Sequence, residues 1–252
     1  MRKIIAVGDK VTVFLDNGSV IDREVTKEEF KKLIETQTDE EVRELLCPEY
    51  KEAVNKHNKV MSFIDKVKAS NILTIKNNTI YWKEVSSLSV PQDFAEVVIA
   101  AEEEKDELKI STYKNFWTLM SLNPSEECRK NLYWFLQLHG LKLAKCGFFV
   151  AYRNVDTTKE KGVYTDHHSH STRIKIGEMV TLPREKCDCD SSVACSRGLH
   201  IGGKGWLKQN YYGNTGLACL INPADVVAVP HIDDYGKLRT YAYLPIEVIN
   251  YD

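Results

Sequence analysis

The stretch CSRGLHIGGKGWLKQNYYGNTGLACLINPADVVAVPH, residues 195–231, decides how the rest of the chain is interpreted. It combines closely spaced glycines, histidines, cysteines and aromatic residues with an apolar run that ends at Pro230. An apolar run bounded by turn-forming residues predicts a buried strand. We therefore expect residues 195–231 to form a site-bearing loop that leads into a strand.

The sequence changes character near residue 140. Before it, alternating apolar and polar residues around the turn at 16–18 predict a small β meander, and Asn77-Asn78 predicts a tight hairpin. After it, β-forming residues dominate, and we expect an α+β fold with a domain of residues 1–140 and a strand-rich domain of residues 141–252. The strands expected in the second domain cover residues 146–155, 175–182, 217–229 and 238–248.

The N-terminal part also carries helix signals. Thr26-Lys27-Glu28-Glu29 and Thr38-Asp39-Glu40-Glu41 are two capping boxes ahead of apolar-periodic residues. Further helices are expected over about 49–66 and 91–105, with a helical turn at 115–120. Asn123 is expected to cap a last helix that ends at Gly140.

Composition narrows the class of protein. The chain has 252 residues, 43% of them hydrophobic, and a formal net charge of −2. A near-neutral charge gives no bulk attraction to nucleic acid or to an anionic membrane. No apolar run approaches the ~20 residues that span a bilayer, and no apolar signal segment follows Met1. We expect a cytosolic protein with reduced cysteines.

Three kinds of chemistry are compatible with these residues. Zinc could be held by thiolate and imidazole ligands, although the C-x-C spacing is unusual and incidental polar loops are the plainer interpretation. These metal candidates are Cys187, Cys189, Cys195 and His200, next to a second group at 166–170 (DHHSH). No cofactor is otherwise expected.

A thiol nucleophile is the second possibility, with Cys195 near His200 and with Asp225 or Asp233 to orient the imidazole. The alternative is that Cys195 is an inert packed thiol.

The third possibility is a phosphate-binding loop. Backbone amides at the start of a helix after 202–205 (GGKG) could receive a phosphate, helped by Arg197, Lys204 or Lys208. The spacing matches neither a Walker loop nor a dinucleotide fingerprint, so a tight strand-to-helix connection is the plainer interpretation.

Several strings occur together in an order typical of one family. They are CSRGLH at 195–200, NPADVVAVP at 222–230, LRTY at 238–241, GFFVAYR at 147–153 and MVTLPR at 179–184. With them the chain resembles the rIIB proteins of T-even phages over nearly its whole length. The T-even relatives begin with an additional helix-turn-helix-like segment, whereas this sequence starts with the meander, so no DNA-binding role is carried over.

The resemblance implies a phage accessory protein of lysis inhibition or of counter-defence against host exclusion systems, working in the host cytoplasm. The partner it implies is a rIIA-like phage protein, similar to GHKL-type ATPases, through which the chain would lie peripheral to the inner membrane. A host defence component is the alternative partner, and self-association is left open. The resemblance implies no catalytic reaction, which favours a binding protein over an enzyme.

The order of elements in the C-terminal part is also similar to that of ADP-ribosyltransferase-like folds. Such enzymes carry a glutamate near a late strand, where this chain offers Arg239, Thr240 and Tyr241, with Glu247 further along. The expectation is a degenerate scaffold that could still hold a nucleotide such as a defence signalling molecule, and a degenerate ADP-ribosyltransferase-like enzyme is the other alternative. In that case Arg153 would pair with a phosphate, His200 with a ribose or phosphate, and Trp206 or Tyr211 would stack on a base. The full set of candidate ligand-binding residues is Arg153, Arg197, His200, Lys204, Trp206, Tyr211 and Arg239.

Overall fold

The computed structural model describes residues 3–85, 87–209, 213–231 and 236–249. The chain divides into an N-terminal unit, Met1–Ala69, and a C-terminal unit, Ser70–Asp252. Helices and antiparallel sheets are both present, which confirms the predicted α+β class. The division falls at 69/70, so the change of composition near residue 140 is a change from helices to strands inside the C-terminal unit.

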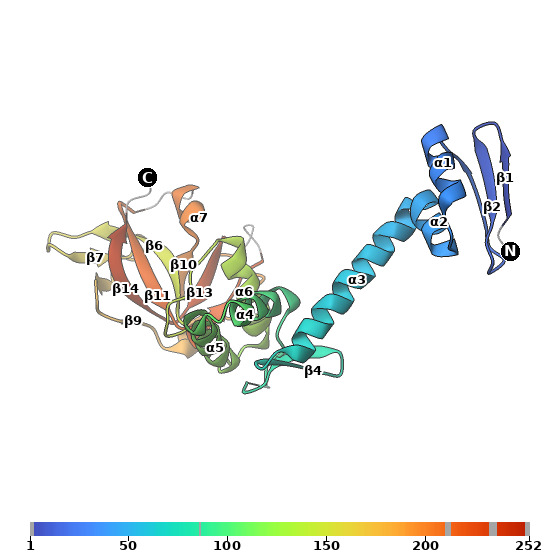
Figure 1. Ribbon diagram of the computed structural model, residues 1–252. Coiled ribbons are helices and arrows are strands. Elements are labelled where there is room, and N and C mark those ends of the chain that lie inside the picture. Colours follow the sequence, from blue (N-terminus) through green and yellow to red (C-terminus); the bar gives the residue numbers. More distant parts are fainter. Residues whose placement is uncertain (1–2, 86, 210–212, 232–235, 250–252) are drawn as a thin grey trace. The chain divides into compact units, whose positions relative to one another are not determined.

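The N-terminal unit opens with the predicted meander (Figure 1). Strands β1 (Lys3–Val7), β2 (Lys10–Phe14) and β3 (Val20–Glu24) pair antiparallel in chain order. Alternation along β2 puts Val11 and Val13 on one face, where they join a buried cluster with Leu33 and Val42 of the following helices. This cluster is the hydrophobic core of the unit.

Both predicted capping boxes are confirmed. Thr26 caps α1 (Lys27–Glu35) and Thr38 caps α2 (Asp39–Leu46), each exchanging hydrogen bonds with the glutamate three residues later. A third helix, α3 (Pro48–Ala69), begins at Pro48, directly after Cys47, the residue that caps the end of α2. Proline suits that first position, because its missing N–H has no partner within a helix.

The C-terminal unit begins with the predicted hairpin. Strands β4 (Leu73–Lys76) and β5 (Thr79–Trp82) pair antiparallel around Asn77 and Asn78, whose φ angles are 50° and 59°. Two consecutive positive φ values are the requirement of a type I′ turn, and asparagine tolerates them well. The sequence prediction for this segment is confirmed.

Three helices follow: α4 (Gln92–Glu103), α5 (Glu107–Ser121) and α6 (Glu126–Leu138). Phe94 of α4 is their packing centre, stacked on Trp117 with ring centroids 4.7 Å apart and edge-on to Tyr133 at 4.6 Å. The expected turn at 115–120 is in fact the end of the 15-residue α5. Its start was missed because the Asp106 side chain, which accepts from the Lys109 amide at 3.0 Å, lies in an acidic run assigned to the previous helix.

Asn123 does not cap α6, which corrects the sequence prediction. Ser125 is the cap, and its hydroxyl accepts from the Cys128 amide at 3.2 Å. The buried Asn123 amide instead donates to the carbonyl oxygens of Pro223 and Val226, both at 2.8 Å. It therefore joins the start of α6 to a distant strand of the sheet.

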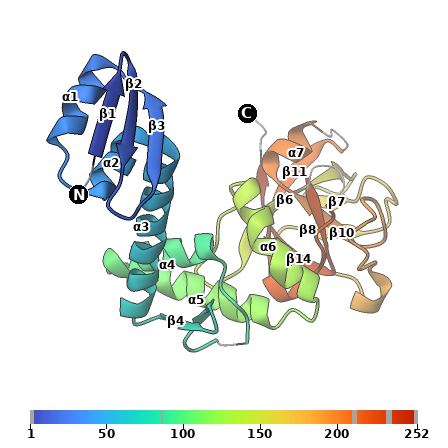
Figure 2. The same cartoon turned by 90° about the vertical axis from the view of Figure 1, so that its right-hand side faces the viewer.

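The large antiparallel sheet of this unit has nine strands, and its main path runs β12-β13-β10-β6-β11-β14-β9. Figure 2 shows α4, α5 and α6 grouped beside this sheet. No helix in the described ranges is long and apolar enough to cross a membrane. The strands are β6 (Phe149–Thr157), β7 (Val163–Thr165), β8 (Arg173–Lys175), β9 (Val180–Thr181), β10 (Leu199–Gly202), β11 (Thr215–Ile221), β12 (Val226–Ala228), β13 (Lys237–Thr240) and β14 (Ala242–Ile249), and the short helix α7 covers Lys204–Gln209.

Candidate ligand-binding site

Arg153 lies on the central strand β6 and turns its side chain into the sheet packing. Its Nη1 donates to the carbonyl oxygen of His200 at 2.8 Å, and its guanidinium lies 5.5 Å from the ring centroid of Tyr243. The Nε of Arg153 and the hydroxyl of Tyr243 are both buried without a hydrogen-bond partner within the described residues. Buried polar atoms are rarely left unpaired, so this spot retains unused hydrogen-bonding capacity.

His200 on β10 is a neutral side chain. Its Nε2 lies 2.8 Å from the carbonyl oxygen of Ser196, and because that oxygen only accepts, Nε2 must carry the hydrogen. Burial, followed by the neighbouring cations of Lys237, Arg153 and Arg239, lowers the pKa of His200 to about 4, against the opposing effect of the Ser196 hydrogen bond. At neutral pH it carries no positive charge for a phosphate.

Cys195 and Trp206 meet at a third residue, Lys237. The Lys237 ammonium donates to the Cys195 sulfur at 2.9 Å and lies 5.2 Å from the Trp206 ring centroid. One side of the indole is thereby occupied by a cation from β13. Cys195 itself remains exposed.

Arg239 on β13 is fully buried and serves the loop of residues 188–193. Its Nε donates to the carbonyl oxygen of Asp188 at 2.9 Å and its Nη1 to that of Val193 at 2.5 Å, while Nη2 donates to that of Asp190. The guanidinium therefore fixes an irregular loop through backbone carbonyls. These three hydrogen bonds satisfy the buried guanidinium, so no ligand is needed to explain why an arginine lies here.

Two glycines of the stretch, Gly202 and Gly203, have close packing partners, whereas a Cβ at Gly205 would meet no atom within 4 Å. A Cβ at Gly203 would lie 2.4 Å from His139 Nδ1, and one at Gly202 would lie 3.1 Å from the Trp206 ring. The first separation is far below any real Cβ contact, so a side chain cannot fit there. Close packing beside α7 explains these residues, and α7 has only six residues.

The thiol and imidazole ligands predicted for zinc are dispersed. Cys187 is buried with its sulfur 3.8 Å from the Pro183 carbonyl oxygen, whereas Cys189 and Cys195 are exposed. Within the described ranges, no group of three or more His, Cys, Asp or Glu side chains has an arrangement that could hold a metal ion. In the 166–170 loop, His167 Nδ1 lies 2.9 Å from an Asp156 oxygen.

The predicted nucleophile has a different set of neighbours. The Cys195 sulfur accepts from Lys237, the His200 ring donates to Ser196, and the Asp225 carboxylate accepts from the Tyr241 hydroxyl at 2.8 Å. No proton path of the expected Cys-His-Asp type links these described side chains. Asp233, the other expected acid, and Tyr211, the expected stacking residue, lie outside the described residues.

The remaining candidates, Arg197 and Lys204, are exposed. The structure thus brings Arg153, His200, Trp206 and Arg239 into one region of the sheet, where protein groups satisfy most of their interactions.

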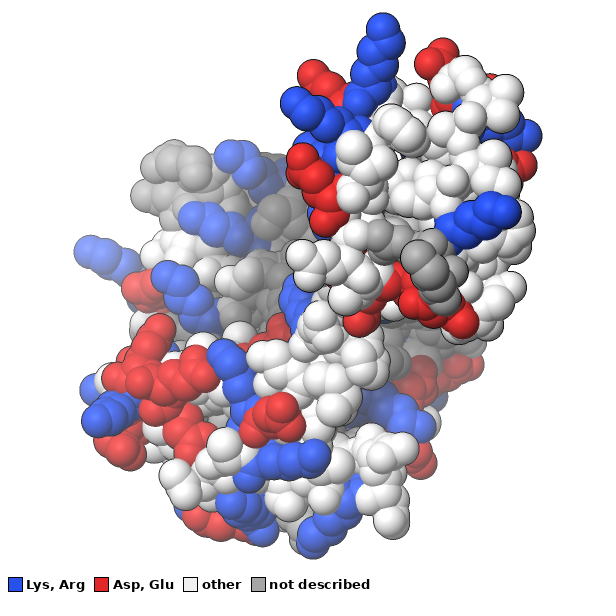
Figure 3. All heavy atoms as spheres, turned by 45° about the vertical axis from the view of Figure 1, so that its right-hand side comes forward, with Lys and Arg blue, Asp and Glu red and all other residues white. Residues whose placement is uncertain are grey.

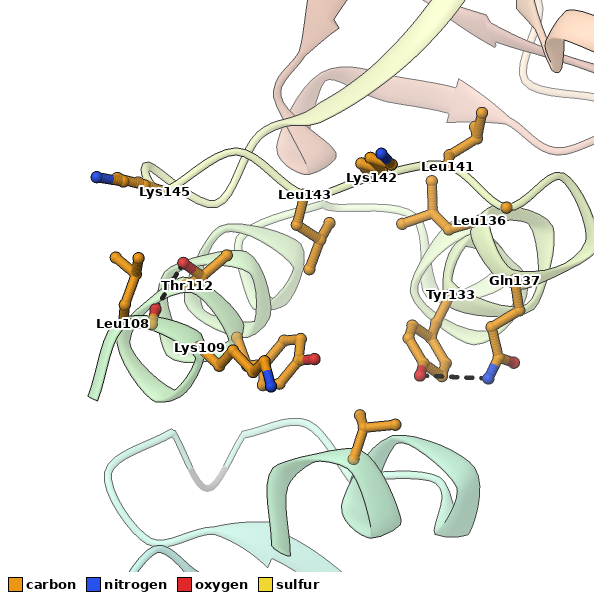
Figure 4. A pocket seen from close by; sticks show the side chains of 13 residues that line it. Leu108, Lys109, Thr112, Tyr133, Leu136, Gln137, Leu141, Lys142, Leu143 and Lys145 are labelled. Carbon is orange, nitrogen blue, oxygen red and sulfur yellow. Dashed lines mark hydrogen bonds between the residues drawn. The ribbon is translucent and has the colours of Figure 1, made fainter. Parts of the chain in front are cut away.

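Sequence reasoning missed a cavity of about 570 Å³ among α4, α5, α6 and residues 140–145 (Figure 4). Apolar residues on its wall, such as Val97 and Leu136, had been interpreted only as core. The available signal was the alternation Leu141-Lys142-Leu143-Ala144-Lys145, which places cations beside apolar side chains.

The family described as Bacteriophage T4 protein rIIB matches residues 4–248. Protein rIIB of Enterobacteria phage T4 is 29% identical over 128 residues, which cover 50% of this chain and 39% of the T4 protein. The match thus spans well under half of that relative's length. No solved structure matches, so the ADP-ribosyltransferase-like topology stays a prediction. Because the family match extends over almost the whole sequence, the chain belongs to the rIIB family of phage proteins.

Proposed function

We propose that this protein acts by binding, as a phage accessory protein of the rIIB type in lysis inhibition or counter-defence against host exclusion systems. The partner is a rIIA-like phage protein, with a host defence component as the alternative. It works in the host cytoplasm and reaches the inner membrane through that partner. Family membership supports the phage role, and the surface described next supports binding.

The observation that carries the proposal is the outer face of the β1–β3 sheet. Strand pairing places Ile5 opposite Thr12, and Phe14 between Lys3 and Val20, so their side chains share the face opposite to the core. The large apolar residues of this N-terminal sheet face, with their exposed fractions, are Ile5 (42%), Val7 (75%), Phe14 (39%) and Val20 (51%). Clustered apolar side chains of this kind are typical of protein interaction sites.

Charged residues accompany these apolar side chains. Lys10 and Asp22 form an ion pair at 3.0 Å on the same face, and Thr12 donates to Asp22 at 2.9 Å. Basic and acidic side chains are interspersed over the surface seen in Figure 3. Apolar contacts among paired polar groups suit a protein partner better than a nucleic acid, which requires a concentrated positive field.

The candidate site also supports binding over catalysis. Arg239 is held by three backbone carbonyls and His200 is neutral and bonded to Ser196. A general acid or base must be able to reach the reacting group, and these side chains are committed elsewhere.

Co-purification of the tagged chain with the rIIA-like protein of the same phage tests the proposal. We expect retention of that partner by the wild type and its loss with Phe14→Glu, which places a charge on the N-terminal sheet face. Lys51→Glu on the exposed surface of α3 is the matched control and should retain it. Failure of the wild type to retain the partner under gentle conditions would count against the proposal.

Nucleotide binding is the second candidate, and the unpaired Arg153 Nε and Tyr243 hydroxyl favour it. Calorimetric titration with a panel of nucleotides and cyclic nucleotides is the test. A heat signal that is lost in Arg153→Met would support it. No heat with any member of the panel would remove it.

A further inference from the structure

The cavity among the three helices lies wholly inside the C-terminal unit. Its walls are Val97 of α4, Leu108 and Thr112 of α5, Leu136 of α6 and the segment 140–145 (Figure 4). Its volume of about 570 Å³ falls within the range of roughly 300–1,000 Å³ that holds small-molecule ligands. A ligand here would touch four separate parts of the chain.

The lining of this helix cavity combines aliphatic side chains and two tyrosines with polar and charged groups. Leu143 projects from the covering segment and completes an apolar wall with the helical residues. Figure 4 shows Leu143 pointing into the space between α5 and α6, whereas Leu141 points away from it. Such a surface selects an apolar ligand body, because a polar one would lose its hydrogen bonds to water without replacement.

Several polar side chains on the wall already have partners. The Thr112 hydroxyl donates to the Leu108 carbonyl oxygen at 2.8 Å, and the Gln137 amide donates to the Tyr133 hydroxyl at 3.2 Å. Lys109 is paired with Glu104 at 2.7 Å. Because these side chains already have partners, they are poorly placed to form hydrogen bonds with a nucleobase. Recognition of a nucleobase requires donors and acceptors that are not yet paired.

Two further cations differ from Lys109. Lys142 and Lys145 lie on the covering segment, are exposed, and form no ion pair with any described residue. Their backbone is nevertheless fixed, because the Lys142 carbonyl accepts from the Val150 amide and the Lys145 carbonyl from the Asn115 side chain, both at 2.9 Å. A fixed segment thus holds the Lys142 side chain, which forms no ion pair with a described residue, above an apolar cavity, whereas the Lys145 side chain points away from the cavity (Figure 4).

We propose that the helix cavity binds a medium-chain carboxylate, with the alkyl chain against Val97, Leu136 and Leu143 and the carboxylate beside Lys142. The apolar wall accounts for the chain, and the Lys142 cation accounts for the negative head group, with Lys145 adding positive charge on the same segment. This site is separate from the N-terminal sheet face and from the Arg153 region, so it does not depend on the proposed function.

Calorimetric titration of the full chain with octanoate and decanoate, below their aggregation concentrations, tests the chain contact. Burial of a methylene group gives about 0.8 kcal/mol, so each added methylene should tighten binding about fourfold. Binding of decanoate roughly tenfold or more tighter than octanoate supports the proposal. Equal affinities, or no binding of decanoate at millimolar concentration, overturn it.

A charge variant tests the head-group contact. Lys142→Met with Lys145→Met keeps the aliphatic stems and removes both cations, and decanoate should bind at least fivefold more weakly while decanol binds as before. The matched control is Lys130→Met, an exposed lysine on α6 that pairs with Glu126; decanoate affinity should not change. An unchanged decanoate affinity in the double variant contradicts the proposal.

The same carboxylate or phosphate chemistry also occurs on a lipid surface. Titration with phosphatidylglycerol vesicles distinguishes binding to a lipid surface from binding of a dissolved fatty acid. Binding of dissolved decanoate without vesicles assigns the site to a single fatty-acid chain. Lysine-dependent binding to vesicles without any binding of dissolved decanoate would overturn the proposal.

Discussion

Arg239 donates from its Nε to the carbonyl oxygen of Asp188, 2.9 Å away, although neither residue is near the other in sequence. With two further bonds to Val193 and Asp190, the buried guanidinium organises the loop before β10. The positive charge of Arg239 is compensated by carbonyl dipoles. The pKa of Asp190 is lowered mainly by the hydrogen bond from the Ser192 hydroxyl, and the charge of Arg239 contributes to the same shift. The arginine most suggestive of a ligand site therefore has a structural role.

Arg239→Lys should destabilise the C-terminal unit, because one ammonium cannot reach three carbonyls in a fork geometry. The expected loss is about 3–5 kcal/mol in the free energy of unfolding. All four tryptophans lie after residue 69, so tryptophan fluorescence during urea unfolding reports this unit. Arg173→Lys, at an exposed ion pair with Glu160, is the control and should change stability by at most about 0.5 kcal/mol. Similar effects of the two variants would contradict the structural role.

Asn123→Asp tests the link between α6 and the sheet. The carboxylate has the same shape but cannot donate to the Pro223 and Val226 carbonyls, and it places a negative charge against them. We expect a loss of about 3 kcal/mol or more in the free energy of unfolding, exceeding the loss in Asn123→Ala. Urea unfolding of both variants makes the comparison. Equal stability of the aspartate variant and the wild type would refute the assigned hydrogen bonds.

His200 makes stability depend on pH. Its pKa of about 4 in the folded protein lies below the ordinary value of 6.5. Between these values the unfolded chain binds a proton that the folded chain does not, so stability is full above pH 6.5 and falls as the pH is lowered toward 4. Between pH 7 and pH 5 the expected loss from this group is about 2 kcal/mol.

The variant His200→Gln keeps an N–H donor for the Ser196 carbonyl and removes the titration. Between pH 7 and pH 5, the free energy of unfolding of this variant should decrease by about 2 kcal/mol less than that of the wild type. Urea unfolding at both pH values measures the difference. Parallel pH profiles of the two proteins would show that His200 is not held neutral.

Thiol labelling distinguishes the exposed cysteines from the buried ones. Cys146, Cys189 and Cys195 are exposed, whereas Cys128 and Cys219 are buried, and burial raises the pKa of Cys219 to about 12. An aromatic disulfide reagent should label the three exposed thiols rapidly and the two buried ones only after unfolding. Peptide mapping by mass spectrometry identifies them. Rapid labelling of Cys219 in the folded protein would be incompatible with its place in β11.

Local sequence signals were sufficient for several elements. The capping box at Thr26 and the positive-φ pair Asn77-Asn78 depend on residues close in sequence, and the structure confirms both. The start of α5 was missed because Asp106 is an ordinary cap hidden within a charged run. Local pattern alone cannot show where one acidic helix end stops and the next begins.

The site could not be predicted in the same way. Asn123 binds carbonyls about a hundred residues away, and Lys237 on β13 binds Cys195 in the loop before the neighbouring strand β10. These contacts depend on the order of the strands in the sheet, and local sequence patterns do not predict that order. The glycines near residue 203 suggested a phosphate loop, but Gly203 is required by the close approach of His139, the residue that follows α6.

The central claim is that the chain acts by binding through the N-terminal sheet face. The direct measurement is the dissociation constant between the purified chain and the rIIA-like protein of the same phage, for the wild type and Phe14→Glu, with Lys51→Glu as control. A charge buried in an interface typically costs at least about 2 kcal/mol, so we expect the Phe14 variant to bind at least about thirtyfold more weakly and the control to bind like the wild type. Equal dissociation constants for all three proteins, or no binding of the wild type, would contradict the claim.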